Sequence, residues 1–347
     1  MLKAYKFVET DHQKLHSFVL AFFDRIEYEI GAFSIDFFDV NFRPIVKRHR
    51  KILNAAFEDI YNELKEWSQD DRSQLCLELR QSNDIEKICS RETKPKKFSD
   101  ADTAIYKKIK KLFIDLYASV LNGGVVHDVL GFVLKEHFDA FRKANNNITL
   151  CPMCGISELK TEYDNSRDQY DHYLPKAIYP LSSINFYNLM PICKDCNSLD
   201  VKGEKDILAL TTHKLFYPYD QNHEGIEVNF SIQKDDKNIA NIDWAVTFKS
   251  LDGKDQELDA WKLIFNIENR YVGFVKGRIE KWYRAYWGYH QNVKSDASNF
   301  EEKNKDYFAA LRADENECLD VIRYPAFSTL LTSSGLTRAE QEAYRYS

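Results

Sequence analysis

Two Cys-x-x-Cys pairs, Cys151–Cys154 and Cys193–Cys196, are the strongest chemical signal in the sequence. In each pair the two-residue gap lets both sulfurs of one turn point at the same ion, and four thiolates complete a tetrahedral zinc site. Such a site is structural because no coordination position is left for water or substrate, and its metal contributes on the order of 10 kcal/mol to folding. The alternative is four ordinary buried cysteines. We predict a structural Zn²⁺ bound by these four residues.

Four polar residues lie between and directly after the pairs: Asp171, His172, Asn188 and Asn197. Imidazole titrates near neutral pH and can take a proton from water, which makes His172 a candidate general base. The Asp171 carboxylate and the Asn197 amide oxygen are hard ligands of the kind that Mg²⁺ prefers. The alternative is a satisfied histidine in a structural zinc module, with Asn188 as a turn residue and Asn197 as a helix cap.

In order, these residues read Cys-x-x-Cys, Asp-His-x-x-Pro and Asn-Leu-x-Pro-x-Cys-x-x-Cys-Asn. This string resembles the HNH (His-Me finger) endonucleases, in the subgroup whose ββα active site is clamped by two Cys-x-x-Cys knuckles. The match runs from Cys151 to about Gly203, roughly one sixth of the chain.

The resemblance implies a role for each of the four polar residues. It makes His172 the general base at a strand end, and Asp171 with Asn197 the ligands of Mg²⁺ or Mn²⁺. Asn188 would fix the loop that orients the imidazole, and Asn197 would open the helix of the ββα finger. The sequence departs from the family pattern in having Asn197 instead of His at the third signature position. It also places Lys202 five residues beyond Asn197, where a basic residue usually lies closer.

The resemblance also implies a DNA endonuclease that leaves 5′-phosphate and 3′-hydroxyl ends. Similar HNH proteins are effector nucleases of bacterial anti-phage systems, including the Septu type, in which an ATPase subunit is the partner. The sequence contains no G-x-x-x-x-G-K-[ST] loop, so an ATPase would be another chain. A homodimer would be needed for a double-strand break if each finger nicks one strand. Two alternatives stay open: a site-specific restriction or mobile-element endonuclease, and a catalytically idle zinc-finger scaffold that binds nucleic acid.

Contacts with nucleic acid have to be local, because the net charge of the chain is −6. A run of like charge is usually a solvated helix face, and that remains the alternative for any basic cluster. The candidate contacts are one basic run in the N-terminal part and three lysines of the finger: Arg43, Lys47, Arg48 and Arg50, and Lys176, Lys194 and Lys202.

The elements that must position these residues follow from composition and periodicity. With 14% aromatic residues and only 12 Gly and 8 Pro in 347 residues, we expect an α+β fold that is mainly helical. Apolar residues at helical spacing predict helices over about 10–26, 43–67 and 99–122. Alternation of apolar and polar residues predicts two antiparallel strands near 226–232 and 244–248, and the helical pattern returns after residue 253. The aromatic run at 282–289 is expected to be core.

We therefore expect three domains. These are an N-terminal helical domain (1–145), an HNH ββα nuclease module with zinc (146–220), and a C-terminal β-hairpin and helical region (221–347). Asn145–Asn147 is the uncharged polar break that marks the first boundary. No window of 18 uncharged apolar residues and no signal peptide are recognised, so we expect a cytoplasmic protein that does not contact membranes.

Overall fold

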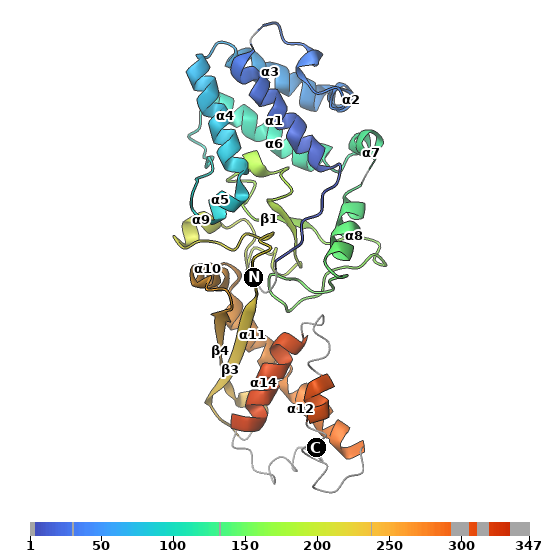
Figure 1. Ribbon diagram of the computed structural model, residues 1–347, viewed down its shortest axis with the longest axis vertical. Helices are drawn as coiled ribbons and strands as arrows, with labels where there is room; N and C mark the ends of the chain where they lie inside the picture. The colour runs from blue at the N-terminus through green and yellow to red at the C-terminus, as the bar shows by residue number, and fades with distance from the viewer. Residues whose placement is uncertain are drawn as a thin grey trace. The chain divides into compact units, whose positions relative to one another are not determined.

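The computed structural model is an α+β fold, about half helical, with two small antiparallel sheets (Figure 1). This agrees with the mainly helical α+β class predicted from composition. The residues that the structure describes are 4–29, 31–131, 133–236, 238–292, 305–310 and 319–333.

The chain divides into two compact units. The first, here called the helical unit, comprises Ala4–Asn147 and Lys160–Gln221. The second, here called the terminal unit, comprises Met1–Lys3, Ile148–Leu159 and Asn222–Ser347. Each unit is described by itself.

The helical unit owes its core to amphipathic helices, of which α1, α3, α4 and α6 pack together in Figure 1. Helix α1 buries Phe18, Val19, Phe22 and Phe23 on one face, as the apolar spacing predicts. Its helical elements before the first cysteine pair are, in chain order, α1 (Gln13–Tyr28), η1 (Ile35–Phe37), α2 (Arg43–Arg48), η2 (Arg50–Asn54), α3 (Ala55–Leu64), α4 (Gln69–Asn83), α5 (Ile85–Cys89), α6 (Ala104–Asp115), η3 (Leu116–Val120), α7 (Gly124–Leu130) and α8 (Leu134–Ala144).

The continuous helix expected over residues 43–67 is interrupted by the π-helical turn η2. The wider turn adds a residue to the helical repeat, so that apolar residues on both sides of it face the same core. The fully buried residues include Ile45 and Val46 before this turn, Leu53 within it and Phe57 after it. A second π-helical turn, η3, continues α6 and carries Tyr117.

The segment between the two Cys-x-x-Cys pairs contains the strands β1 (Tyr170–His172) and β2 (Leu189–Pro191). They pair antiparallel, with His172 opposite Leu189. The short helix η4 (Pro180–Ser182) lies between them in the chain. The prediction of a helix that begins at Asn197 is wrong. Residues 194–204 form turns and bends, and the next helix is α9 (Ile207–Leu210). Short polar side chains in this stretch favour turns over helix.

Residues 160–221 share one core with the N-terminal helices, whereas the sequence predicts a separate module at 146–220. Two three-residue strands bury too little apolar surface to be stable alone. Their apolar side chains and those of the loop between them instead join the cluster built by the helices, as Tyr170, Leu181, Ile184, Phe186 and Leu189 show.

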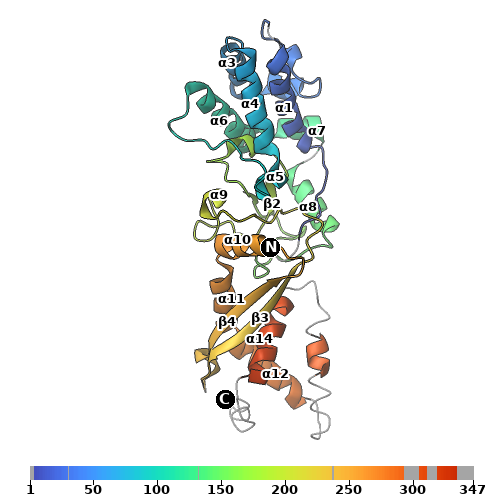
Figure 2. The same cartoon turned by 60° about the vertical axis from the view of Figure 1, so that its left-hand side comes forward.

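The terminal unit contains a hairpin of β3 (Ile226–Lys234) and β4 (Asp243–Ser250), with α14 against β3 (Figure 2). The predicted strand pair and the return to helix after residue 253 are thus confirmed. The aromatic run is core as expected at Trp282, Tyr283, Tyr286 and Trp287, which are buried, whereas Tyr289 at its end is 38% exposed. The remaining elements are η5 (Ile239–Asn241), α10 (Asp255–Phe265), α11 (Ile267–Lys276), α12 (Ile279–Asn292) and α14 (Leu319–Ser333).

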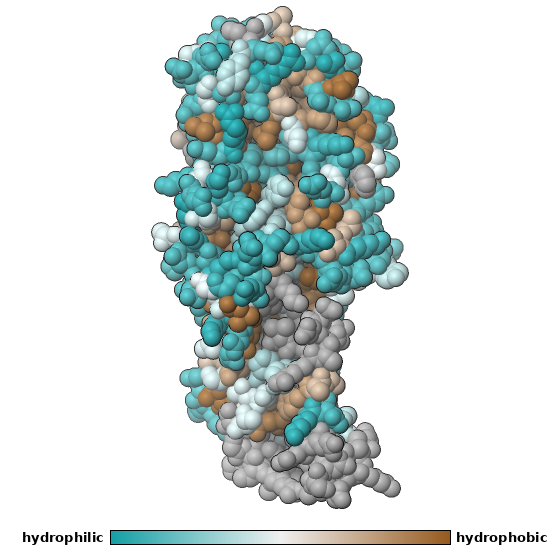
Figure 3. Space-filling model, viewed as in Figure 1, coloured by the Kyte–Doolittle hydropathy of each residue, from teal (hydrophilic) through white to brown (hydrophobic). Residues whose placement is uncertain are grey.

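Among the described residues, no helix has the length and apolar character needed to cross a bilayer. On the face drawn in Figure 3, hydrophobic side chains of the coloured residues are mostly scattered among hydrophilic ones.

The shared core predicts that truncation of Leu181 lowers the stability of the helices. Leu181 is fully buried in the helical cluster, so we expect Leu181→Ala to reduce the free energy of unfolding by about 2–5 kcal/mol, as for other core Leu→Ala changes. Urea unfolding followed by the helical circular dichroism signal measures this. Leu210→Ala, at a 43% exposed position of α9, is the matched control and should change the midpoint little. An unchanged helical transition in Leu181→Ala would contradict the shared core.

Candidate functional site

The four predicted zinc ligands come together. The Sγ atoms of Cys151, Cys154, Cys193 and Cys196 all lie within 4.8 Å of one another, and all four residues are buried. Each pair closes a tight turn in which a backbone N–H faces a sulfur: Ile156 N lies 3.4 Å from Cys154 Sγ, and Cys196 N lies 3.4 Å from Cys193 Sγ. Four thiol donors at this spacing suit tetrahedral zinc, so the cluster can hold a structural Zn²⁺.

The first knuckle is anchored within the terminal unit by two buried aromatic side chains. Trp261 Nε1 donates to the carbonyl of Met153 at 2.7 Å, and the Tyr271 hydroxyl donates to the carbonyl of Cys154 at 2.8 Å. These bonds satisfy both the aromatic polar groups and the turn carbonyls, as burial requires.

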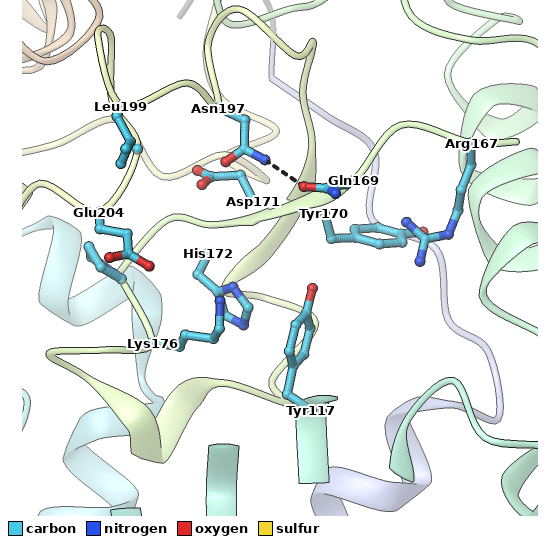
Figure 4. Close-up of a pocket in the computed structure, with 12 residues that line it drawn as sticks. Tyr117, Arg167, Gln169, Tyr170, Asp171, His172, Lys176, Asn197, Leu199 and Glu204 are labelled. Atoms are coloured by element: carbon cyan, nitrogen blue, oxygen red, sulfur yellow. Dashed lines mark hydrogen bonds between the residues drawn. The ribbon is translucent and has the colours of Figure 1, made fainter. Parts of the chain in front are cut away.

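Three of the predicted catalytic residues line one cavity of about 490 Å³ in the helical unit (Figure 4). They are Asp171 and His172 of β1 and Asn197 of the turn after Cys196. Lys176 and Glu204 also line this cavity, so acidic, basic and amide side chains converge on it.

His172 is held in one tautomer. Its Nε2 lies 3.0 Å from the carbonyl oxygen of Ser183. A carbonyl only accepts hydrogen bonds, so Nε2 carries the proton and Nδ1 of the neutral ring is the acceptor. Burial, with smaller contributions from Lys176 and Lys202, lowers the pKa of His172 to about 3. The ring is therefore neutral at neutral pH, the form that can take a proton. The ring of Tyr117 meets it edge to face, with centroids 4.3 Å apart.

Asn188 does not line the cavity but fixes the loop behind it. Its Oδ1 accepts from Leu174 N at 2.7 Å, and its Nδ2 donates to the carbonyls of Leu174 at 3.1 Å and Ser182 at 3.2 Å. The side chain is fully buried. Asn188 thereby links the backbone at Leu174, just after His172, to Ser182. The next residue, Ser183, carries the carbonyl that accepts from the imidazole.

Asp171 forms a buried ion pair with Lys202. Lys202 Nζ lies 2.8 Å from Asp171 Oδ2, and it donates to Asp171 Oδ1 at 3.0 Å and to the His172 carbonyl at 2.7 Å. Burial raises the pKa of the Asp171 carboxyl, and the Lys202 ammonium opposes that shift. The sequence predicts Lys202 as a nucleic-acid contact, but its ammonium is buried and has these protein partners instead.

Asn197 lies beside Asp171 in Figure 4. Its Nδ2 donates to Gln169 Oε1 at 3.5 Å, and its Oδ1 points toward the Asp171 carboxylate in Figure 4. The two oxygens are hard donors of the kind that suits Mg²⁺ or Mn²⁺, so this corner of the cavity fits such an ion by donor chemistry.

The other predicted nucleic-acid contacts are spread over the surface of the helical unit. Lys176 lines the cavity, with its ammonium 5.5 Å from the centroid of the Tyr117 ring. Lys194 is exposed and does not line the cavity. The N-terminal run lies on α2 and η2, where Arg43 pairs with Asp36 at 2.8 Å and Arg48 with Asp128 at 2.9 Å, and Lys47 and Arg50 are exposed. A contact of these residues with nucleic acid stays a prediction.

The cavity-lining side chains that sequence reasoning missed include Tyr117, Arg167, Gln169 and Glu204. Arg167 and Gln169 lie within five residues of His172, so their position next to the Asp-His motif was the available signal. Nothing in the sequence points to Tyr117, which reaches the cavity from η3 through the tertiary fold.

Comparison with known proteins gives one short likeness. Protein ea31 of Escherichia phage lambda is 39% identical over 72 residues, which is 20% of this chain and 20% of the relative. The matched stretch thus spans a fifth of the relative's length. No protein-family model matches the chain. No solved structure matches it either.

The cysteine cluster predicts one bound zinc per chain. We expect Cys193→Ser to lose the metal and to lower the melting temperature strongly, because a structural zinc contributes on the order of 10 kcal/mol to folding. Elemental analysis of the purified protein measures the zinc content. The control is Cys89→Ala, a buried thiol outside the cluster, which should keep its zinc. A wild-type protein that melts at the same temperature with and without zinc would contradict the site.

The Asn188 bonds predict a stability cost that Asn197 does not share. Asn188→Ala leaves the buried N–H and C=O of Leu174 without these bonds, so we expect a loss of about 2–5 kcal/mol in the free energy of unfolding. Asn197→Ala removes one 3.5 Å bond at a half-buried position and should cost under about 1 kcal/mol. Chemical denaturation of both variants measures the difference, and equal losses would contradict this reading.

Proposed function

We propose that this protein is a metal-dependent DNA endonuclease of the HNH type. The observation that carries the proposal is the Nε2 contact between His172 and the Ser183 carbonyl, at 3.0 Å. It leaves Nδ1 as a proton acceptor on a ring that lines the same cavity as Asp171 and Asn197. A neutral imidazole and hard oxygen donors in one cavity can supply the general base and the metal ligands for hydrolysis of a phosphodiester.

In this mechanism His172 takes a proton from the attacking water through Nδ1, while the Ser183 carbonyl holds the ring in place. Asn188 is a positioning residue, because it ties the loop after His172 to Ser182. Asp171 and Asn197 would hold Mg²⁺ or Mn²⁺. When bound, that ion neutralises charge on the scissile phosphate and the leaving oxygen. Lys176, at the cavity, is placed to attract a phosphate group.

The proposed biological role is that of an effector nuclease in bacterial anti-phage defence. The role rests on the resemblance of the Cys-Asp-His-Asn-Cys string to HNH nucleases of such systems. The net charge of −6 supports delivery to DNA by a partner, an ATPase subunit or another component, because free binding to DNA should be weak. A homodimer would serve double-strand cleavage by two nicking sites.

One observation favours the alternative of a catalytically idle zinc scaffold. The Asp171 carboxylate, needed as a metal ligand, is already neutralised by Lys202 at 2.8 Å. A scaffold would keep this ion pair permanently, whereas in a nuclease Asp171 must release Lys202 in order to bind the metal ion.

The test is cleavage of supercoiled plasmid by the purified, zinc-loaded protein with Mg²⁺ or Mn²⁺. We expect the wild type to convert the plasmid, and His172→Ala to lose at least about a hundredfold in rate because general-base catalysis contributes roughly 10²–10⁴-fold. His127→Ala, at an exposed histidine of α7, is the matched control and should cleave like the wild type. Equal cleavage by wild type and His172→Ala would overturn the proposal. Discrete fragments would indicate a site-specific endonuclease, and random nicking would favour the defence effector.

A further inference from the structure

Lys202 is a fully buried lysine that bonds two residues of the proposed active site. Its side chain is 0% exposed, and that of its partner Asp171 is 4% exposed. Its Nζ donates to both a carboxylate oxygen and the His172 carbonyl, at 3.0 and 2.7 Å. Lysine is almost never fully buried without a compensating charge. The carboxylate and the ammonium therefore depend on each other for burial.

The turn after the second cysteine pair is shaped to deliver this ammonium. Lys202 N donates to the carbonyl of Cys196 at 3.3 Å, and Gly203 follows with a φ of +46°. A Cβ at Gly203 would lie 2.8 Å from Leu199 Cα, so the close turn requires glycine at this position. Lys202 thus points inward because the backbone turns there.

The same carboxylate is the proposed ligand of the divalent ion. A Mg²⁺ at its usual distance of about 2.1 Å from Asp171 Oδ2 would lie within about 5 Å of the Lys202 nitrogen, which is 2.8 Å from that oxygen. Both are cations in a site of low effective dielectric, where their repulsion is much larger than in water. Holding Mg²⁺ and the Lys202 ammonium at Asp171 at the same time would therefore be costly.

From this geometry we infer that Lys202 is an internal counter-ion that competes with the divalent metal for Asp171, so that metal loading requires its ammonium to leave the carboxylate. This inference rests on the proposed function, because it takes Asp171 as the metal ligand. The metal-free site is then stable and closed by its own cation. Mn²⁺ affinity is weakened by the cost of breaking the ion pair.

The first test is Mn²⁺ affinity of the full-length, zinc-loaded protein, measured from the free Mn²⁺ signal in electron paramagnetic resonance. Lys202→Met keeps the length of the side chain and removes its charge. We expect it to bind Mn²⁺ at least tenfold more tightly than the wild type and to gain more melting temperature from added Mn²⁺. Affinity equal to or weaker than that of the wild type would overturn the inference.

Two variants control this measurement. Lys205→Met removes a nearby exposed lysine whose Nζ bonds backbone carbonyls of the same turn, so it should leave Mn²⁺ affinity unchanged. Adding Asp171→Asn to Lys202→Met should abolish the tightened binding. If the tightened binding persists without the Asp171 carboxylate, the metal lies elsewhere and the inference is overturned.

A second measurement needs only the wild type and covers the case in which Lys202→Met fails to fold. Acetylation of lysines by an amine-specific reagent is read by mass spectrometry with and without saturating Mn²⁺. We expect acetylation of Lys202 to rise at least fivefold with Mn²⁺, while that of Lys205 stays constant. Unchanged or reduced acetylation of Lys202 at saturating Mn²⁺ would overturn the exchange.

These readouts are independent of DNA cleavage. Tightened Mn²⁺ binding in Lys202→Met without plasmid cleavage by any variant supports the exchange and counts against the nuclease. Cleavage by the wild type with unchanged affinity in Lys202→Met overturns the exchange and leaves the nuclease standing.

Discussion

The candidate site depends on the burial of two very short strands against a helical core. β1 and β2 have three residues each, too few to hold a sheet together in water. Tyr170 and Leu189 are buried in the cluster that α1, α3 and α6 build, and so are Leu181 and Phe186 of the connecting loop. The helices therefore do more than precede the site in sequence. They supply the apolar surface without which Asp171 and His172 would have no fixed position.

Around those strands the buried polar groups satisfy one another. Asn188 bonds both backbone groups of Leu174, the Ser183 carbonyl accepts from His172, and Lys202 bonds Asp171 and the His172 carbonyl. In a low-dielectric interior each of these bonds is strong and each missing partner is costly. The network consequently fixes a single arrangement of the imidazole and the carboxylate in the metal-free protein.

The cysteine cluster and the cavity share a segment of backbone. Asn197 N donates to the carbonyl of Cys193, and Lys202 N donates to that of Cys196, so the turn that carries both side chains starts from the second knuckle. A metal held by the four thiolates would restrain this turn directly. The structural ion would thus act on the chemistry only through geometry, which matches the closed coordination that four cysteines provide.

The sequence alone determined what depends on residue type and local spacing. The paired Cys-x-x-Cys spacing predicted the buried four-cysteine cluster, and the alternation near residues 226–232 and 244–248 predicted the hairpin β3–β4. The apolar spacing of α1 predicted its buried face. These are properties of one turn, one strand pair or one helix face, and the periodicity of the chain encodes them.

Tertiary structure alone decided the partners of charged and polar groups. Lys202 reads as an exposed basic residue, yet a turn and Gly203 carry it to Asp171, and Tyr117 reaches His172 from a π-helical turn far away in the chain. The helix expected at Asn197 gave way to turns, and residues 160–221 joined the helical unit instead of standing alone. Burial and charge pairing are set by residues distant in sequence, so local pattern does not contain them.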